Sequence, residues 1–147
     1  ALDERRRPYG CYRFDATTVK ESDGRHLEVW FPGVHSDVGG QYDDDHHASD
    51  VAFDWMLREA HEAGLALSKQ KYSSLLSVPF STGLPAGHAT EGWLHPNGRT
   101  WILAGGWRSR RPLPGDLVHP TVDEWIDHGN AGKPYRPDRA PDLQRLT

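Results

Sequence analysis

Hydrophobic residues recur at helical spacing over one stretch near the middle of the chain. Residues 48–63 place alanines, Val51 and Trp55 on a single stripe, which predicts an amphipathic helix. Asp50 stands near its start, where an acceptor for unpaired backbone N–H groups is favoured, and Gly64 follows its end. The pattern therefore predicts one well-defined helix of about four turns.

Strand patterns are shorter and more scattered. Aromatic and β-branched residues over 27–31 predict a strand that follows a turn at 23–24 and leads into a glycine-rich loop at 32–40. Further extended segments are expected over 12–19 and 100–104. Strand, loop and helix thus follow one another in the order typical of α/β folds.

The remaining chain has weaker patterns. A short helix is expected within 72–78. Thr121 and Glu124 stand three residues apart, as in a capping box, and predict a helix over 122–128. From residue 133 onward, repeated prolines indicate an irregular tail that lies over the surface.

Composition indicates a thin hydrophobic core. Only 36% of the 147 residues are hydrophobic, and the mean hydropathy is −0.74. This suits one modest domain or a piece of a larger one. The single cysteine, Cys11, excludes an intrachain disulfide. We recognise no signal peptide and no membrane-spanning apolar run, so the protein is expected either in the cytoplasm or exported without a signal peptide.

The charge of the chain gives no reason to expect a nucleic-acid partner. The formal net charge is −4, with 17 basic and 21 acidic residues. Two short basic clusters, 5–7 and 108–111, are expected to be solvated or to pair with carboxylates.

His35 is the residue best placed for chemistry. It lies four residues beyond Phe31, the end of the predicted strand, and ligands of open α/β sheets bind outside the carboxyl ends of the strands. An imidazole suits a general base because its pKa lies near neutrality. The pattern alone leaves two interpretations open, a catalytic base and a hydrogen-bonded structural histidine in a turn.

The segment over 29–40, VWFPGVHSDVGG, resembles the histidine segment of a bacterial and fungal α/β-hydrolase family that includes phospholipase effectors of type VI secretion. Weaker similarities lie in family order over 1–6, 54–56, 119–122 and 135–137. The resemblance implies an α/β fold class. The whole chain, as a single partial domain, would form the C-terminal segment of an α/β-hydrolase, with the last sheet strands, the histidine loop, the following helix and irregular cover.

The resemblance also implies a Ser-His-Asp triad, in which His35 takes the proton from serine and returns it to the leaving group. Three acids remain candidates for holding the imidazole: Asp3, Asp37 and an acid upstream of residue 1. Asp37 is the most awkward of the three, because it lies only two residues from His35.

No serine in the chain fits the nucleophile. None of the nine serines has glycine at both −2 and +2, as a G-x-S-x-G elbow requires. Ser81 comes closest, with Gly83 at +2, but its −2 residue is Pro79. The nucleophile half is therefore expected in an N-terminal segment or a partner chain, and this chain alone is expected to be inactive. The complete enzyme would hydrolyse an ester, a phospholipid on the resemblance, without a cofactor.

Two rival interpretations remain. The chain could be a non-enzymatic interaction module, a degenerate relative of the hydrolases. It could also be a metal-dependent hydrolase that uses residues 43–47 with Asp50, although a solvated acidic loop is the preferred interpretation of that segment.

Several aromatic residues have both a structural and a functional interpretation. His119 is expected to support the helix that follows it, with a place in the active-site crevice as the alternative. Three tryptophans are expected to pack in the core or between domains: Trp93, Trp101 and Trp107. The alternative is that they form an apolar wall for acyl chains.

Overall fold

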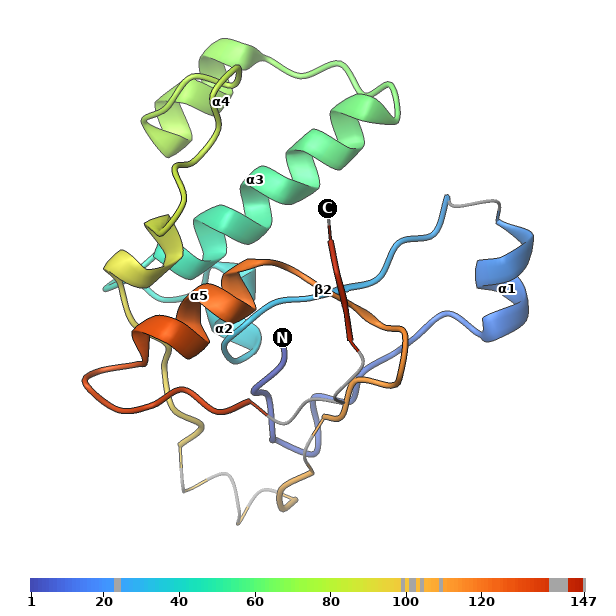
Figure 1. The fold of residues 1–147 in the computed structure, drawn as a ribbon, viewed down its shortest axis with the longest axis vertical. Helices are drawn as coiled ribbons and strands as arrows, with labels where there is room; N and C mark the ends of the chain where they lie inside the picture. Colours follow the sequence, from blue (N-terminus) through green and yellow to red (C-terminus); the bar gives the residue numbers. More distant parts are fainter. Residues whose placement is uncertain are drawn as a thin grey trace.

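A small parallel sheet lies at the centre of the fold in the computed structural model (Figure 1). Its strands are β1 (Val29–Trp30), β2 (Leu117–Val118) and β3 (Gln144–Arg145), in the order β1-β2-β3. Both strand pairs are parallel. The structure describes residues 1–22, 25–98, 100, 103, 105–108, 110–137 and 143–146.

The first residues of the chain extend this sheet beyond β1. The backbone N–H of Leu2 donates to the Phe31 carbonyl (2.8 Å), whereas the neighbouring Trp30 carbonyl accepts from His119 on the β2 side (2.9 Å). Successive carbonyls of a strand point to opposite edges, so the N-terminal segment lies on the edge of β1 that β2 leaves open. This brings Asp3 next to the loop that follows β1.

The core is small, as the composition predicts. Leu2 joins one buried residue from each of β1, β2 and the helix α5 (Thr121–His128), and residues further along the chain complete the cluster. Its members are Leu2, Trp30, Val118, Val122, Ile126 and Leu143. Burial of such side chains stabilises the fold by about 1.5–3 kcal/mol each.

Several helices pack together around the histidine loop. The helix α3 (His47–Glu62) confirms the predicted helix over 48–63 to within one residue. It packs against α2 (His35–Gly39) and against the 3-10 helix η1 (His88–Glu91), which also contacts α5. The helix expected within 72–78 is α4 (Lys69–Leu76). The described chain therefore mixes helices with a parallel sheet, in agreement with the predicted α/β class.

None of the described helices could cross a membrane.

The extended segment predicted over 12–19 is wrong in its second half, which forms the helix α1 (Ala16–Glu21). The side chain of Asp15 accepts a hydrogen bond from the Thr18 backbone N–H and so caps the helix at its start. A local cap therefore outweighs the β-branched residues that suggested a strand. In Figure 1, α1 lies apart from the other helices, on the side of the molecule opposite to α4 and α5.

Three further predictions need correction. α5 begins one residue earlier than predicted: Pro120 is the N-cap and Thr121 the first helical residue, so the capping box is not formed. The tail is not wholly irregular, because it contributes β3. The glycine-rich loop contains α2. The turn at 23–24 and most of the strand expected over 100–104 lie outside the described residues.

Candidate active site

His35 stands at the carboxyl end of β1, where α2 begins. Val34 precedes it as the N-cap, in extended backbone. The His35 side chain is exposed, and its ring lies beside that of Tyr9, with centroids 5.2 Å apart. The ring is therefore open to a reacting group at the end of the sheet where α/β enzymes bind ligands.

Three carboxylates hold the backbone around His35. The successive N–H groups of residues 33–35 donate to Asp3 (2.7 Å), Asp37 (2.8 Å) and Glu4 (3.1 Å) in turn. Hydrogen bonds to ionised acceptors are about twice as strong as neutral ones. We name Asp3, Glu4 and Asp37 the carboxylate clamp. The clamp fixes the conformation of the backbone that carries His35.

Gly33 is required by this geometry. Its φ is +93°, a conformation that side chains other than glycine rarely adopt. A Cβ at this position would lie 2.7 Å from the Asp37 carboxylate, closer than atoms can pack. The glycine of the loop motif therefore makes room for one arm of the clamp.

Glu4 is the most deeply buried arm. Its side chain is fully buried, and the Arg6 guanidinium binds it with both Nε (2.8 Å) and Nη2 (2.7 Å). Burial by itself opposes ionisation, but the hydrogen bonds from Arg6 and from the His35 backbone outweigh it and hold the pKa of Glu4 at about 2. Glu4 is thus a permanent anion beneath the histidine.

The pKa values of the other two arms shift in the opposite direction, because burial outweighs their hydrogen bonds. Burial raises the pKa of Asp3, although hydrogen bonds from the Tyr135 hydroxyl (2.7 Å) and Gly33 oppose the change. Burial likewise raises the pKa of Asp37 against the hydrogen bonds from Val34 and His95. Both carboxyls nevertheless accept a backbone hydrogen bond, which is stronger when the carboxyl is ionised.

Asp37 pairs with a second histidine, His95. Its Oδ1 lies 2.7 Å from the Nδ1 of His95, whose ring stacks on Tyr42 with centroids 3.5 Å apart. The other ring nitrogen faces Asp44 at 3.3 Å. Burial alone would lower the pKa of His95, but the contact with Asp37, supported by Asp44, raises it. This contact joins the histidine loop to the segment around residue 95.

The structure brings Asp3 and Asp37 to the histidine loop, where each accepts a backbone hydrogen bond and also bonds to a side chain other than His35. Within the described part of the chain, no carboxylate bonds to the ring of His35. Asp37 uses both oxygens, whereas Asp3 accepts both of its side-chain hydrogen bonds on Oδ2 alone. The identity of the triad acid stays a prediction.

Sequence reasoning missed Glu4 and His95. Glu4 stands beside the candidate Asp3, but its role depends on a contact with His35, 31 residues away. His95 pairs with an acid 58 residues earlier and carries no local motif. Only long-range contacts reveal these two residues.

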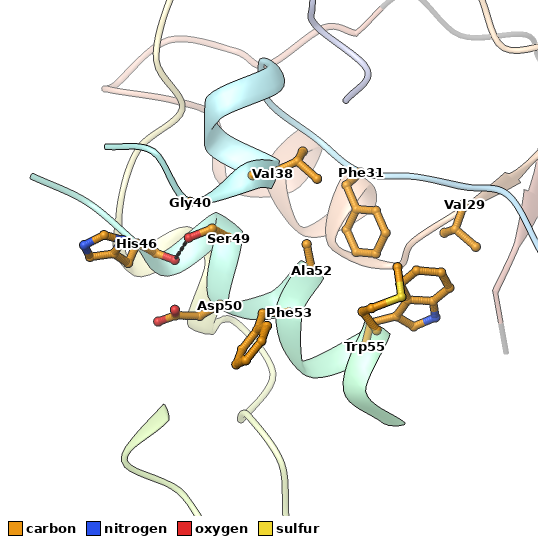
Figure 2. A pocket seen from close by; sticks show the side chains of 12 residues that line it. Val29, Phe31, Val38, Gly40, His46, Ser49, Asp50, Ala52, Phe53 and Trp55 are labelled. Atoms are coloured by element: carbon orange, nitrogen blue, oxygen red, sulfur yellow. Dashed lines mark hydrogen bonds between the residues drawn. The ribbon is translucent and has the colours of Figure 1, made fainter. Parts of the chain in front are cut away.

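An apolar groove runs beside α2 (Figure 2). It lies between β1, α2 and α3 and has a volume of about 540 Å³. Its walls include Val29 and Phe31 from the sheet side, Val38 from α2, and Phe53 and Trp55 from α3. Drug-sized ligands favour concave apolar sites of this size.

The acidic segment 43–47 does not converge on one point. Asp45 accepts from the His47 backbone (3.0 Å), whereas Asp44 faces His95. Among the described residues, no three His, Cys, Asp or Glu side chains form a group that could hold a metal ion. Asp50, which the metal hypothesis includes, lies 3.5 Å from His88 on η1.

His119 lies between the sheet and α5. Its ring stacks on Phe31 with centroids 4.6 Å apart, and its Nδ1 lies 2.9 Å from the Thr121 hydroxyl at the start of α5. Burial lowers the pKa of His119 to about 4, so the ring is neutral at pH 7. These contacts are those of a residue that supports the following helix.

Trp93 and Trp107 line a second hollow, of about 540 Å³, together with Asp3 and Tyr135. Both tryptophans are more than two-fifths exposed, so neither belongs to the core. Trp101 lies outside the described residues.

Comparison with known proteins agrees with the resemblance that the histidine segment suggests. No curated protein and no solved structure gives a significant match. A family model, "T6SS, Phospholipase effector Tle1-like, catalytic domain", matches residues 1–59, which include the carboxylate clamp, His35 and most of α3. The resemblance is thereby confirmed: residues 1–59 are similar to the catalytic domain of Tle1-like phospholipase effectors of type VI secretion.

Proposed function

We propose that this chain supplies the histidine-bearing part of a serine-type ester hydrolase that acts on phospholipids, with His35 as the general base. One observation carries the proposal. The exposed ring of His35 stands at the carboxyl end of a parallel strand while three carboxylates fix its backbone. A catalytic group gains most when its position is set before the substrate arrives.

The reaction would follow the acyl-transfer route of serine hydrolases. His35 takes the proton of the serine hydroxyl while Oγ attacks the ester carbonyl carbon, and it then gives that proton to the departing alcohol. Water attacks the acyl-enzyme with the same assistance, which releases the fatty acid and restores the serine. An N-terminal segment or a partner chain would supply the serine.

Asp3 is the stronger candidate for the acid among the clamp residues. Its Oδ1 accepts no hydrogen bond from the described residues, whereas both oxygens of Asp37 are engaged. Asp3 could therefore receive the His35 Nδ1–H after a rotation of the imidazole. An acid upstream of residue 1 remains the alternative.

Phospholipid hydrolysis tests the proposal. The chain is combined with the segment or partner that carries the elbow serine, and fatty-acid release from phosphatidylglycerol vesicles is measured. We expect His35→Ala to lower kcat by about 10³-fold or more, because loss of a triad base removes most of the catalysis. The chain by itself should be inert.

His95→Ala is the matched control. We expect it to retain far more activity than His35→Ala, because it loosens the loop without removing the base. Loss of activity in His95→Ala with activity retained in His35→Ala would instead make Asp37–His95 the acid–base pair. Activity lost on chelation and restored by a divalent ion would favour the metal-dependent rival, and a folded but inactive assembly would favour the interaction module.

A further inference from the structure

The two basic clusters of the sequence lie side by side in the structure. The backbone N–H of Arg108 donates to the Arg5 carbonyl (2.7 Å), and that of Arg7 donates to the Gly106 carbonyl (3.2 Å). A bridge between Arg6 and Trp107 joins the same two segments. Segments about 100 residues apart thus form one surface, although each cluster alone suggests a solvated stretch or a set of partners for carboxylates.

These segments enclose a pocket of about 210 Å³. Tyr9 and Trp30 contribute aromatic walls. All the charged side chains that line the pocket are basic: Arg6, Arg7, Arg13, Arg108, Arg110 and Arg111. We call it the arginine pocket.

Carboxylates neutralise two of the six guanidinium groups. Arg6 pairs with Glu4 at 2.7 Å, and Arg13 pairs with Glu28 at 3.0 Å and Asp116 at 2.7 Å. These two arginines are therefore held in place by protein acids, and they need no external anion.

The other four arginines, Arg7, Arg108, Arg110 and Arg111, have no carboxylate partner among the described residues. Arg110 donates to backbone carbonyls of Ala1 and Tyr9, which hold the guanidinium without neutralising it, and its Nε is buried without a partner. A chain with a net charge of −4 thus concentrates uncompensated positive charge in one hollow. Such a hollow attracts an anion.

The arginine pocket adjoins the proposed base through one shared side chain. Tyr9 lines the pocket, and its ring contacts the imidazole of His35, with centroids 5.2 Å apart. The Tyr9 ring also contacts the Arg6 guanidinium, whose carbon lies 4.1 Å from the ring centroid. An anion held in the pocket would therefore lie about one side chain away from the reacting ester.

We propose that the arginine pocket binds the phosphodiester group of the phospholipid substrate. This rests on the proposed function, because it assigns the part of the substrate that lies next to the scissile ester. Guanidinium groups present paired N–H donors that match two phosphate oxygens, and they stay charged at every physiological pH. The pocket orients the lipid so that its ester reaches His35.

Calorimetric titration tests the proposal without any turnover. The probes are dihexanoylphosphatidylglycerol, which is soluble, and dihexanoylglycerol, which has the same acyl chains but no phosphate. The double variant Arg7→Ala/Arg111→Ala removes two exposed, unpaired guanidinium groups. We expect it to bind the phospholipid at least 10-fold more weakly than wild type, with unchanged affinity for the phosphate-free lipid.

The controls separate fold, charge and geometry. Arg136→Ala removes an exposed arginine outside the pocket and should bind as wild type does. Arg111→Lys keeps the charge but loses the planar fork, and we expect an intermediate affinity. It also serves as the test variant if the double alanine variant fails to fold, which circular dichroism would reveal.

Three results would overturn the assignment. One is equal phospholipid affinity in wild type and in the folded double variant. Another is a loss of phospholipid affinity in Arg136→Ala as large as that in the double variant. The third is arginine-dependent binding of inorganic phosphate with no arginine-dependent binding of the phospholipid, which would make this a free-anion site. Displacement of bound phospholipid by inorganic phosphate would support the assignment of the arginine pocket to the phosphodiester group. Absence of hydrolysis would count against the proposed function alone, since binding requires no serine.

Discussion

Buried carboxylates set the geometry of the candidate site at the scale of single residues. The helix α2 has only five residues, too few to be stable through its own hydrogen bonds. The carboxylate clamp stabilises α2, because Asp3, Glu4 and Asp37 accept hydrogen bonds from the backbone N–H groups just before the helix and at its first residue. Glu4 carries its charge into the interior, and Arg6 compensates for the cost of that burial. The position of His35 therefore depends on acids that do not contact its ring.

A second residue-scale consequence concerns His119 and pH. Its pKa is about 4 in the folded chain because burial disfavours the charged ring, against an ordinary value near 6.5 in the unfolded chain. As pH falls below 6.5, the unfolded state therefore binds the proton first. The stabilisation that His119 provides is complete above pH 6.5 and is lost as pH falls toward 4.

We therefore expect the free energy of unfolding of wild type to fall more than that of His119→Gln between pH 7 and pH 5. The difference should be about 1 kcal/mol, because the ring retains some solvent contact. Urea unfolding at several pH values measures it, with exposed His61→Gln as the control variant. Equal pH slopes in wild type and His119→Gln would contradict the burial of a neutral ring.

At the scale of elements, the sequence pattern predicted the long helix most accurately and missed several of the shortest elements. α3 has 16 residues, so its apolar stripe repeats often enough to be read. β2 and β3 have two residues each, and their pairing rather than their composition defines them. α1 depends on the cap at Asp15, which a strand-like composition conceals.

The candidate site divides in the same way. His35 was identifiable because its motif is contiguous in sequence. Asp3 and Asp37 were singled out as candidates for the triad acid, but their hydrogen bonds to the loop backbone and the whole role of Glu4 depend on contacts that the sequence does not show. The arginine pocket was not predictable, because it needs two clusters about 100 residues apart to pair. Contacts of that span leave no periodic trace in the chain.

The C-terminal strand β3 gives an element-scale prediction. Leu143, just before it, packs against the core, whereas Arg145 within it pairs with Asp123 at the surface. Half-exposed ion pairs contribute less than about 1 kcal/mol, and truncation of a partly buried leucine costs about 2 kcal/mol. We therefore expect Leu143→Ala to lower the free energy of unfolding more than Arg145→Ala in urea titrations. A larger effect of Arg145→Ala would mean that the ion pair, and not apolar packing, holds the strand.

At the scale of the whole molecule, a thin core coexists with exposed apolar side chains, and two of these lie together in one groove. α3 presents Phe53 and Met56 to the groove of Figure 2, and these side chains are 40% and 55% exposed. Apolar side chains scattered singly over a surface need no explanation, but a contiguous set in a groove indicates a ligand or a partner. The groove lies against α2, so any occupant would lie beside the helix that His35 begins.

Occupation of this groove by an apolar ligand can be measured with a fluorescent dye. We expect 1-anilinonaphthalene-8-sulfonate to bind the folded chain and its fluorescence to fall in Phe53→Ser/Met56→Ser, because two walls of the groove become polar. Leu65→Ser is the matched control, since Leu65 is equally exposed, at 54%, but lies outside the groove. Long-chain fatty acid should displace the dye from wild type. If Leu65→Ser lowers the fluorescence as much as the double variant does, the dye reports scattered apolar surface, and the groove has no special affinity for acyl chains.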